Sequence, residues 1–253
     1  MEQGKLLLLC LVLLTVTASP LFAAAPGGPG LSPDEALKLL KEGNARYVEG
    51  KARHPNQDRE RRALTAAQGQ KPFAAVLSCS DSRVPVEILF DRGVGDIFVV
   101  KVAGNIAATY EIASIEGAVE PLGATVVVVL GHTQCGAITA VVEGDKVHGH
   151  VALLVKRIQP AVAKAKAGNP GATGGALVQA AIKANIWQAI EDMLRKSSLI
   201  KKQVKAGKIR VVGAIYDLDT GQVQWLGPHP AQDKLVGLAK PANAGTGKKK
   251  SKQ

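Results

Sequence analysis

The chain has 253 residues, of which 46% are hydrophobic and 21% are charged. This balance argues against a disordered protein, and the length allows one large domain with a substantial core. The formal net charge is +11, from 32 Lys and Arg residues against 21 Asp and Glu residues. A basic excess raises nucleic acid or an anionic surface as a partner, but the aromatic residues needed for base stacking make up only 4%. We therefore expect a globular protein with a lysine-rich surface and no nucleic acid partner.

The first 25 residues have the features of a secretory signal peptide. A single Lys precedes an apolar run over residues 6–16, which is too short to span a bilayer, and small residues then allow cleavage near Ala25. We therefore predict an exported protein, periplasmic or secreted. One of the three cysteines lies within this segment, so the mature chain keeps Cys79 and Cys135.

A Pro- and Gly-rich linker, residues 26–31, leads into the first predicted helix. Ser32 is a suitable N-cap, Pro33 suits the first helical position, and Glu35 completes a capping box. A second helix is expected between residues 58 and 68, with a solvated basic face. Because both helices precede the sheet, we expect them to form an arm that packs on something else, such as another subunit.

From residue 73 onward, strand patterns alternate with helical ones. Continuous apolar runs rich in β-branched residues indicate strands buried on both faces, as in a parallel sheet. The predicted strands are 73–78, 96–102, 125–130 and 209–216, the last followed by an edge hairpin at 222–225, and the predicted helices are 85–90, 108–121, 136–142 and a broken helical section over 147–207. We therefore predict an α/β fold, with a mostly parallel central sheet flanked by helices and an N-terminal helical arm.

The folded domain is expected to cover residues 32–227. Beyond it, residues 228–253 are rich in Pro, Gly and Lys. We predict a disordered basic tail there, capable of weak contact with anionic surfaces.

Two short motifs follow two of the predicted strands. Cys79 comes after strand 73–78, and His132 and Cys135 come after strand 125–130. Open α/β sheets bind ligands beyond the carboxyl ends of their strands, so these three side chains are expected to converge. Two thiolates and one imidazole leave the fourth tetrahedral position of zinc open, which is typical of catalytic sites. We therefore predict a zinc enzyme with one zinc per chain.

A disulfide between Cys79 and Cys135 is the rival interpretation, because two cysteines in an exported chain commonly pair. His132 favours the metal, since a disulfide gives no role to a histidine three residues before a cysteine. A non-catalytic exported protein with this disulfide stays open as the alternative from a different functional class.

Three segments together resemble the β-class carbonic anhydrases: Cys79-Ser80-Asp81-Ser82-Arg83-Val84-Pro85, Gly104-Asn105 and Gly131-His132-Thr133-Gln134-Cys135-Gly136. The resemblance extends over roughly residues 32–227, which would be the catalytic domain. It implies an arm that embraces a partner subunit and a homodimer or a higher even homo-oligomer. It also implies reversible hydration of CO2 to bicarbonate and a proton. A hydrolase of the same family that acts on carbonyl sulfide or carbon disulfide is the nearest alternative, since its metal ligands would be identical.

Asp81 and Arg83 are the predicted catalytic residues. Two thiolates cancel the charge of Zn²⁺, so the ion acidifies water less than one bound by three imidazoles, and the zinc-bound hydroxide must be oriented. Asp81 can accept a hydrogen bond from this hydroxide while Arg83 holds the carboxylate with its planar fork. The resemblance gives the pair this role. It also implies an inactive closed state in which Asp81 itself becomes the fourth zinc ligand.

Overall fold

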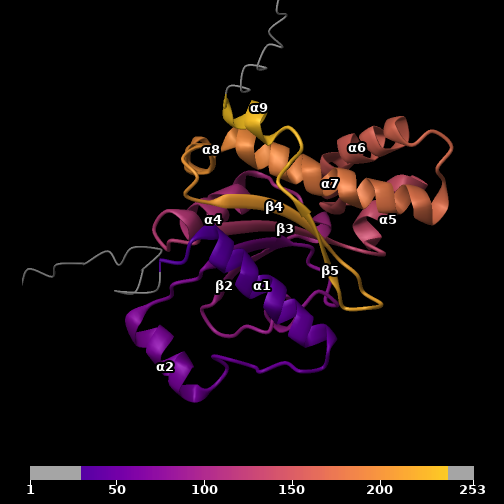
Figure 1. The fold of residues 1–253 in the computed structure, drawn as a ribbon. Coiled ribbons are helices and arrows are strands. Elements are labelled where there is room, and N and C mark those ends of the chain that lie inside the picture. Colours follow the sequence, from indigo (N-terminus) through magenta and orange to yellow (C-terminus); the bar gives the residue numbers. More distant parts are fainter. Residues whose placement is uncertain (1–29, 239–253) are drawn as a thin grey trace, which may run out of the picture.

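Two continuous apolar runs form the centre of a five-stranded sheet in the computed structural model, which describes residues 30–238 (Figure 1). The strands are β1 (Ala74–Ser78), β2 (Ile97–Lys101), β3 (Val126–His132), β4 (Arg210–Tyr216) and β5 (Val223–Gly227). They lie in the order β2-β1-β3-β4-β5, and every neighbouring pair is parallel except β4 and β5. The predicted mostly parallel sheet with an antiparallel edge hairpin is therefore confirmed.

Both faces of the sheet are covered, because alternate residues of its central strands point into two separate cores. Leu77 and Val129 belong to one core, whereas Val76 and Val128 belong to the other. Every residue of β1 and β3 is buried. A strand buried on both faces requires apolar residues at successive positions, which explains why these runs do not alternate with polar residues.

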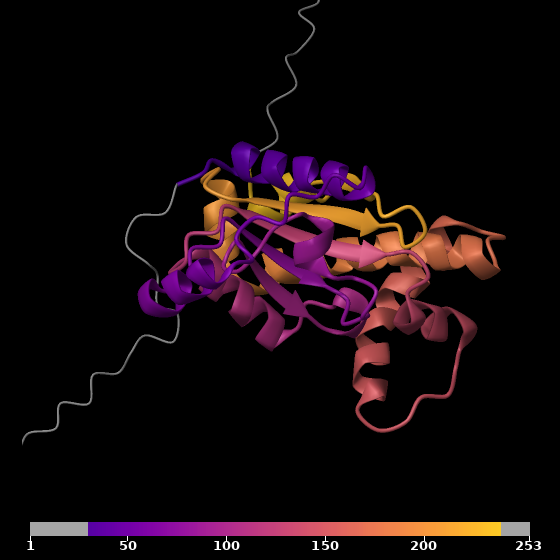
Figure 2. The ribbon, with the colours of Figure 1, turned by 90° about the horizontal axis from the view of Figure 1, so that it is seen from below.

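Helices cover the two faces unequally. The described helices are α1 (Pro33–Val48), α2 (Arg59–Gln68), α3 (Val86–Leu89), the 3-10 turn η1 (Ala103–Asn105), α4 (Thr109–Val119), α5 (Gly136–Glu143), α6 (Val151–Gly168), α7 (Gly174–Lys196), α8 (Ser198–Lys205) and α9 (Gln232–Val236). The first core receives apolar side chains from α4 to α9, and the second receives them from α1 and α3. Figure 2 shows α1, in indigo, running along one side of the sheet. None of the helices described between residues 30 and 238 is long and apolar enough to span a membrane.

The N-terminal helix begins as predicted and packs against its own sheet. Ser32 caps α1, and its backbone N–H donates to the Glu35 carboxylate at 2.8 Å, which completes the capping box. Asn44, near the other end of α1, donates to the carbonyl oxygens of Leu89 and Gly221. Helix α1 therefore closes over its own sheet, and contact of the N-terminal arm with another subunit stays a prediction.

The second helix fits the expectation of a solvated basic face. Asp58 caps α2 through a hydrogen bond accepted from the backbone N–H of Arg61, and no residue of α2 is buried within the described chain. Its arginines therefore lie outside the core. Arg61 forms an ion pair with Asp96, with Nη2 3.3 Å from Oδ1.

The C-terminal boundary of the fold lies later than predicted. Helix α9 falls within the segment 228–253 that was expected to be disordered, and Val236 on it is 1% exposed in the first core. Helix α9 packs against α7 and α8, so the fold extends beyond residue 227. Residues 239–253 of the predicted tail and the predicted signal peptide, residues 1–25, lie outside the described residues.

Candidate active site and metal centre

The sheet register brings the three predicted metal ligands together. Strands β1 and β3 are neighbours, with Ser78 opposite Leu130, so Cys79 emerges beside the end of the strand that carries His132. Cys135 is the N-cap of α5, directly after the turn that follows β3. The ligand atoms of the three residues lie within 4.8 Å of one another, and all three residues are buried. The expected convergence is therefore present.

The ring of His132 is oriented for metal binding. Its Nδ1 lies 2.8 Å from the carbonyl oxygen of Thr133, which only accepts, so Nδ1 carries the proton and donates. Its Nε2 is buried and has no hydrogen-bond partner among the described residues. An unpaired buried acceptor is costly, and a metal ion would take this lone pair.

Cys79 and Cys135 are free thiols and do not form the disulfide of the rival interpretation. The thiol of Cys135 donates to the sulfur of Cys79, and this hydrogen bond, with one from the backbone N–H of Gly104, lowers the pKa of Cys79. The same donation, together with burial, raises the pKa of Cys135. Of the two cysteines, Cys79 is therefore the one that loses its proton more readily. Two sulfur donors and one imidazole nitrogen are the donor set that zinc prefers, and the residues present fit that ion.

Asp81 lies beside the ligand cluster and is held by Arg83. The Arg83 guanidinium donates to both carboxylate oxygens, and the Arg83 backbone N–H adds a third hydrogen bond. These bonds hold the pKa of Asp81 well below its usual range, so the carboxylate is ionised at neutral pH. Oδ2 of Asp81 is 3.8 Å from Nε2 of His132. All five predicted site residues therefore meet at one edge of the sheet.

Lys101, at the end of β2, is a site residue that the sequence did not reveal. Its Nζ donates to the carbonyl oxygens of Asp81 at 3.2 Å and of Val84 at 2.9 Å. The ammonium group therefore ties both ends of the turn that carries Asp81 and Arg83. The only local sign was a charged residue at the end of an otherwise apolar strand.

The second motif is tied to the end of β4 through Thr133. The backbone N–H of Thr133 donates to the Tyr216 carbonyl oxygen, and Oγ1 of Thr133 accepts from the Leu218 backbone N–H, both at 2.9 Å. The turn between His132 and Cys135 therefore rests on β4 as well as on β3.

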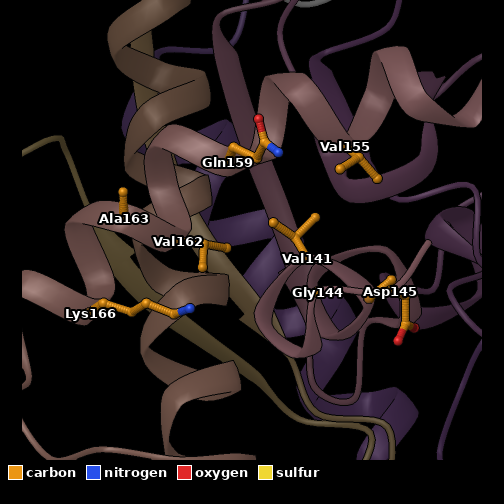
Figure 3. A pocket seen from close by; sticks show the side chains of 9 residues that line it. Val141, Gly144, Asp145, Val155, Gln159, Val162, Ala163 and Lys166 are labelled. Atoms are coloured by element: carbon orange, nitrogen blue, oxygen red, sulfur yellow. The ribbon is translucent and has the colours of Figure 1, made fainter. Parts of the chain in front are cut away.

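A separate surface cavity of about 310 Å³ lies between α5 and α6. Figure 3 shows its lining, which combines Val141, Val155 and Val162 with Asp145 and Lys166. None of the metal ligands and neither Asp81 nor Arg83 lines it. This cavity is therefore separate from the predicted metal site.

Known proteins are similar to this chain in both sequence and fold. The sequence model of the carbonic anhydrase family matches residues 74–223. Carbonic anhydrase 2 of Mycobacterium tuberculosis is 38% identical over 198 residues, covering 77% of this chain and 93% of that protein. A carbonic anhydrase of Mycolicibacterium smegmatis is also 38% identical, over 200 residues, covering 78% of this chain and 94% of that protein.

Solved structures of β-carbonic anhydrases have a similar fold. The β-carbonic anhydrase CafA of Aspergillus fumigatus superposes with a TM-score of 0.64 at 25% identity, over 81% of this chain and 96% of that one. The β-carbonic anhydrase CcaA gives a TM-score of 0.61 at 25% identity, over 76% of this chain and 99% of that one. The family match, the identity to curated relatives and the shared fold lead to one conclusion: the chain belongs to the β-class carbonic anhydrase family.

Proposed function

We propose that this protein catalyses the reversible hydration of CO2 to bicarbonate and a proton, with zinc held by Cys79, His132 and Cys135. The observation that carries the proposal is the position of the ionised Asp81 carboxylate, whose Oδ2 lies 3.8 Å from the unpaired Nε2 of His132. A catalytic zinc site needs three protein ligands, an open position and a group that orients the nucleophile there. Cys79, His132 and Cys135 would be the three ligands. Asp81 would be the orienting group, and Arg83 holds Asp81 in place.

Zinc in this site would supply Lewis acidity, which lowers the pKa of a water molecule and provides a nucleophile near neutral pH. Asp81 would accept a hydrogen bond from that nucleophile and so aim its lone pair at the carbon of CO2. A carboxylate whose pKa lies far below neutral is a poor proton acceptor, so Asp81 acts by orientation and not as a general base. Arg83 keeps both carboxylate oxygens in place.

A closed state, in which Asp81 takes the fourth zinc position, is part of the proposal. The short distance from Asp81 to His132 supports it. Reaching that state requires Asp81 to give up the hydrogen bonds from the Arg83 guanidinium, at 3.0 and 2.8 Å. Bonds of this charge-assisted kind are strong, so breaking them opposes the closed state.

Zinc analysis combined with a CO2 hydration assay tests this function. Purified protein should hold about one zinc per chain, and Cys79→Ser and His132→Ala should each lose most of the metal and the activity. His148→Ala is the matched control, because His148 is exposed in a loop and is not a member of the ligand cluster. Metal-free native protein with a Cys79–Cys135 disulfide would overturn the proposal. Comparing kcat/KM for CO2, carbonyl sulfide and carbon disulfide separates the anhydrase from a hydrolase of the same family.

We also propose that the protein is exported and works outside the cytoplasm. The support is the apolar run of residues 6–16 followed by small residues up to Ala25. Mass spectrometry of the native protein should find a mature chain that starts near Pro26. A full-length chain in the cytoplasm would exclude export and leave the proposed chemistry unaffected.

A homodimer, or a higher even homo-oligomer, is the proposed assembly. Large side chains exposed on the described surface support it, among them Tyr110 at 84% and Leu153 at 64% exposure. Exposed apolar groups of this size favour burial against another surface. Sedimentation velocity at micromolar concentration should show a dimer or a larger even species, and a stable monomer would exclude it.

A further inference from the structure

Gly104 in η1 connects a metal-ligand sulfur with the interior of helix α7. Its backbone N–H donates to Sγ of Cys79 at 3.3 Å. Its carbonyl oxygen accepts a hydrogen bond from Nδ2 of Asn185 on α7 at 2.6 Å. Cys79 and Asn185 therefore both form hydrogen bonds with the backbone of the same residue, Gly104.

Asn185 is an unusual residue for its surroundings. It is 2% exposed, and its neighbours on α7, Ile182 and Ile186, belong to the first core. A buried amide costs free energy unless it is hydrogen-bonded. The hydrogen bond to the Gly104 carbonyl oxygen satisfies Nδ2 of Asn185 and compensates for placing an amide in this apolar environment.

The backbone at η1 needs such support. Gly104 has a φ of +71° and Asn105 a φ of +42°, so two successive residues adopt the left-handed region. A Cβ at Gly104 would lie 2.6 Å from Cδ1 of Ile158, so a larger residue would have to displace that methyl group as well as adopt a φ that L residues rarely adopt. Left-handed conformations persist where surrounding contacts determine them. The hydrogen bond from Asn185 fixes the direction of the Gly104 carbonyl and thereby the path of the backbone on both sides of it.

We propose that Asn185 is a positioning residue of the zinc centre, which holds Gly104 so that its N–H stays on the Cys79 sulfur. This inference rests on the proposed zinc function. An N–H···S hydrogen bond withdraws electron density from a thiolate, so the sulfur donates less to the metal and the metal stays more electrophilic. Partners of metal ligands also orient them, and losing such a partner commonly lowers metal retention.

Replacing Asn185 by an apolar residue of similar shape tests the role. Asn185→Leu keeps the branched shape of the side chain, although it is larger, and removes the donor. In cobalt-substituted protein, the thiolate-to-cobalt absorption band should move to lower energy, because the sulfur regains electron density. Zinc should also leave the variant about tenfold faster in the presence of a chelator, because the Gly104 segment that holds the Cys79 sulfur in place loses its support from Asn185.

Asn44→Leu is the matched control. Asn44 is also buried and also donates to backbone carbonyls, but its partners join α1 to α3 and to the start of β5. The control should lose stability without moving the cobalt band or the rate of zinc release. A folded Asn185→Leu protein with the wild-type band and the wild-type rate would overturn the inference.

A measurement on the wild type keeps the test decisive if Asn185→Leu does not fold. In cadmium-substituted protein, NMR should show coupling between ¹¹³Cd and the Gly104 amide, and slow exchange of the Asn185 side-chain amide. Absence of either signal would overturn the inference. Wild-type protein that binds no metal would instead overturn the proposed function, so the two failures are distinguishable.

Discussion

The guanidinium of Arg83 holds both carboxylate oxygens of Asp81, with Nε 3.0 Å from Oδ1 and Nη2 2.8 Å from Oδ2. The two residues are only two positions apart, and the Arg83 backbone N–H adds a hydrogen bond of 2.9 Å to Oδ1. The Asp81 side chain is 17% exposed, whereas that of Arg83 is 53% exposed. The carboxylate is thus fixed on the protected side of the pair, next to His132.

Asp81→Asn should keep the fold and the zinc but lose most of the CO2 hydration activity. An amide has the shape of the carboxylate, but it cannot accept a charge-assisted hydrogen bond. The expected loss is about tenfold to a hundredfold, or about 1.4–2.7 kcal/mol of transition-state stabilisation. Stopped-flow rates should be measured together with zinc content and circular dichroism. A fully zinc-loaded variant at the wild-type rate would contradict the role of Asp81.

Arg83→Lys should reduce the rate to a similar extent, because an ammonium group cannot form the two parallel hydrogen bonds that a guanidinium forms. Zinc content should remain that of the wild type. Arg195→Lys is the control, since Arg195 forms an exposed pair with Glu191 one helical turn away. Equal activity of Arg83→Lys and the wild type would show that a point charge suffices.

Lys101→Met should lower kcat while leaving zinc content unchanged. The change removes two hydrogen bonds from the turn of Asp81 and Val84. Each such bond contributes about 1 kcal/mol to the stability of the turn. If about half of the lost stabilisation displaces Asp81, kcat should fall about fivefold. Lys101→Arg should restore most of the rate, because it keeps a cationic donor. If Lys101→Met reacts at the wild-type rate, the turn holds its position without Lys101.

Asp91→Asn tests a buried carboxylate that supports the segment between α1 and α2. Burial raises the pKa of Asp91, but hydrogen bonds from Arg46 and from the backbone N–H groups of Arg53 and His54 outweigh it and leave the pKa lowered. A lowered pKa means that the ionised form stabilises the fold at a pH above the unfolded value of about 4, and that this stability is lost as pH falls through the folded value.

The variant should therefore lose about 2–4 kcal/mol of unfolding free energy at pH 7, and the difference from the wild type should shrink below about pH 4. Urea titrations at several pH values measure it. Glu49→Gln is the control, because Glu49 pairs with Lys51 at the exposed surface and should change stability little. A difference that stays constant down to low pH would contradict the ionised state of Asp91.

The central strands and the ligand cluster were predictable because each depends on a local pattern. Burial on both faces removes polar residues from β1 and β3, and the ligands follow directly after those strands. The contact between Asn185 and Gly104 was not predictable, since the two residues are 81 positions apart and one Asn in an apolar helix gives no sign of its partner. Helix α9 was missed because five residues are too few to show helical periodicity.

The distribution of the metal ligands along the chain determines when the site can form. Cys79 follows β1 and His132 ends β3, and the whole of β2 and α4 lies between them in the sequence. The cluster therefore does not exist until the parallel pairing of β1 with β3 has closed that long loop, which is a slow, non-local step in folding. An unfolded chain presents only His132 and Cys135 close together, so zinc has little to bind at that stage. Zinc would consequently enter a sheet edge that has already formed, unlike the ion of a small zinc finger, in which metal binding drives folding.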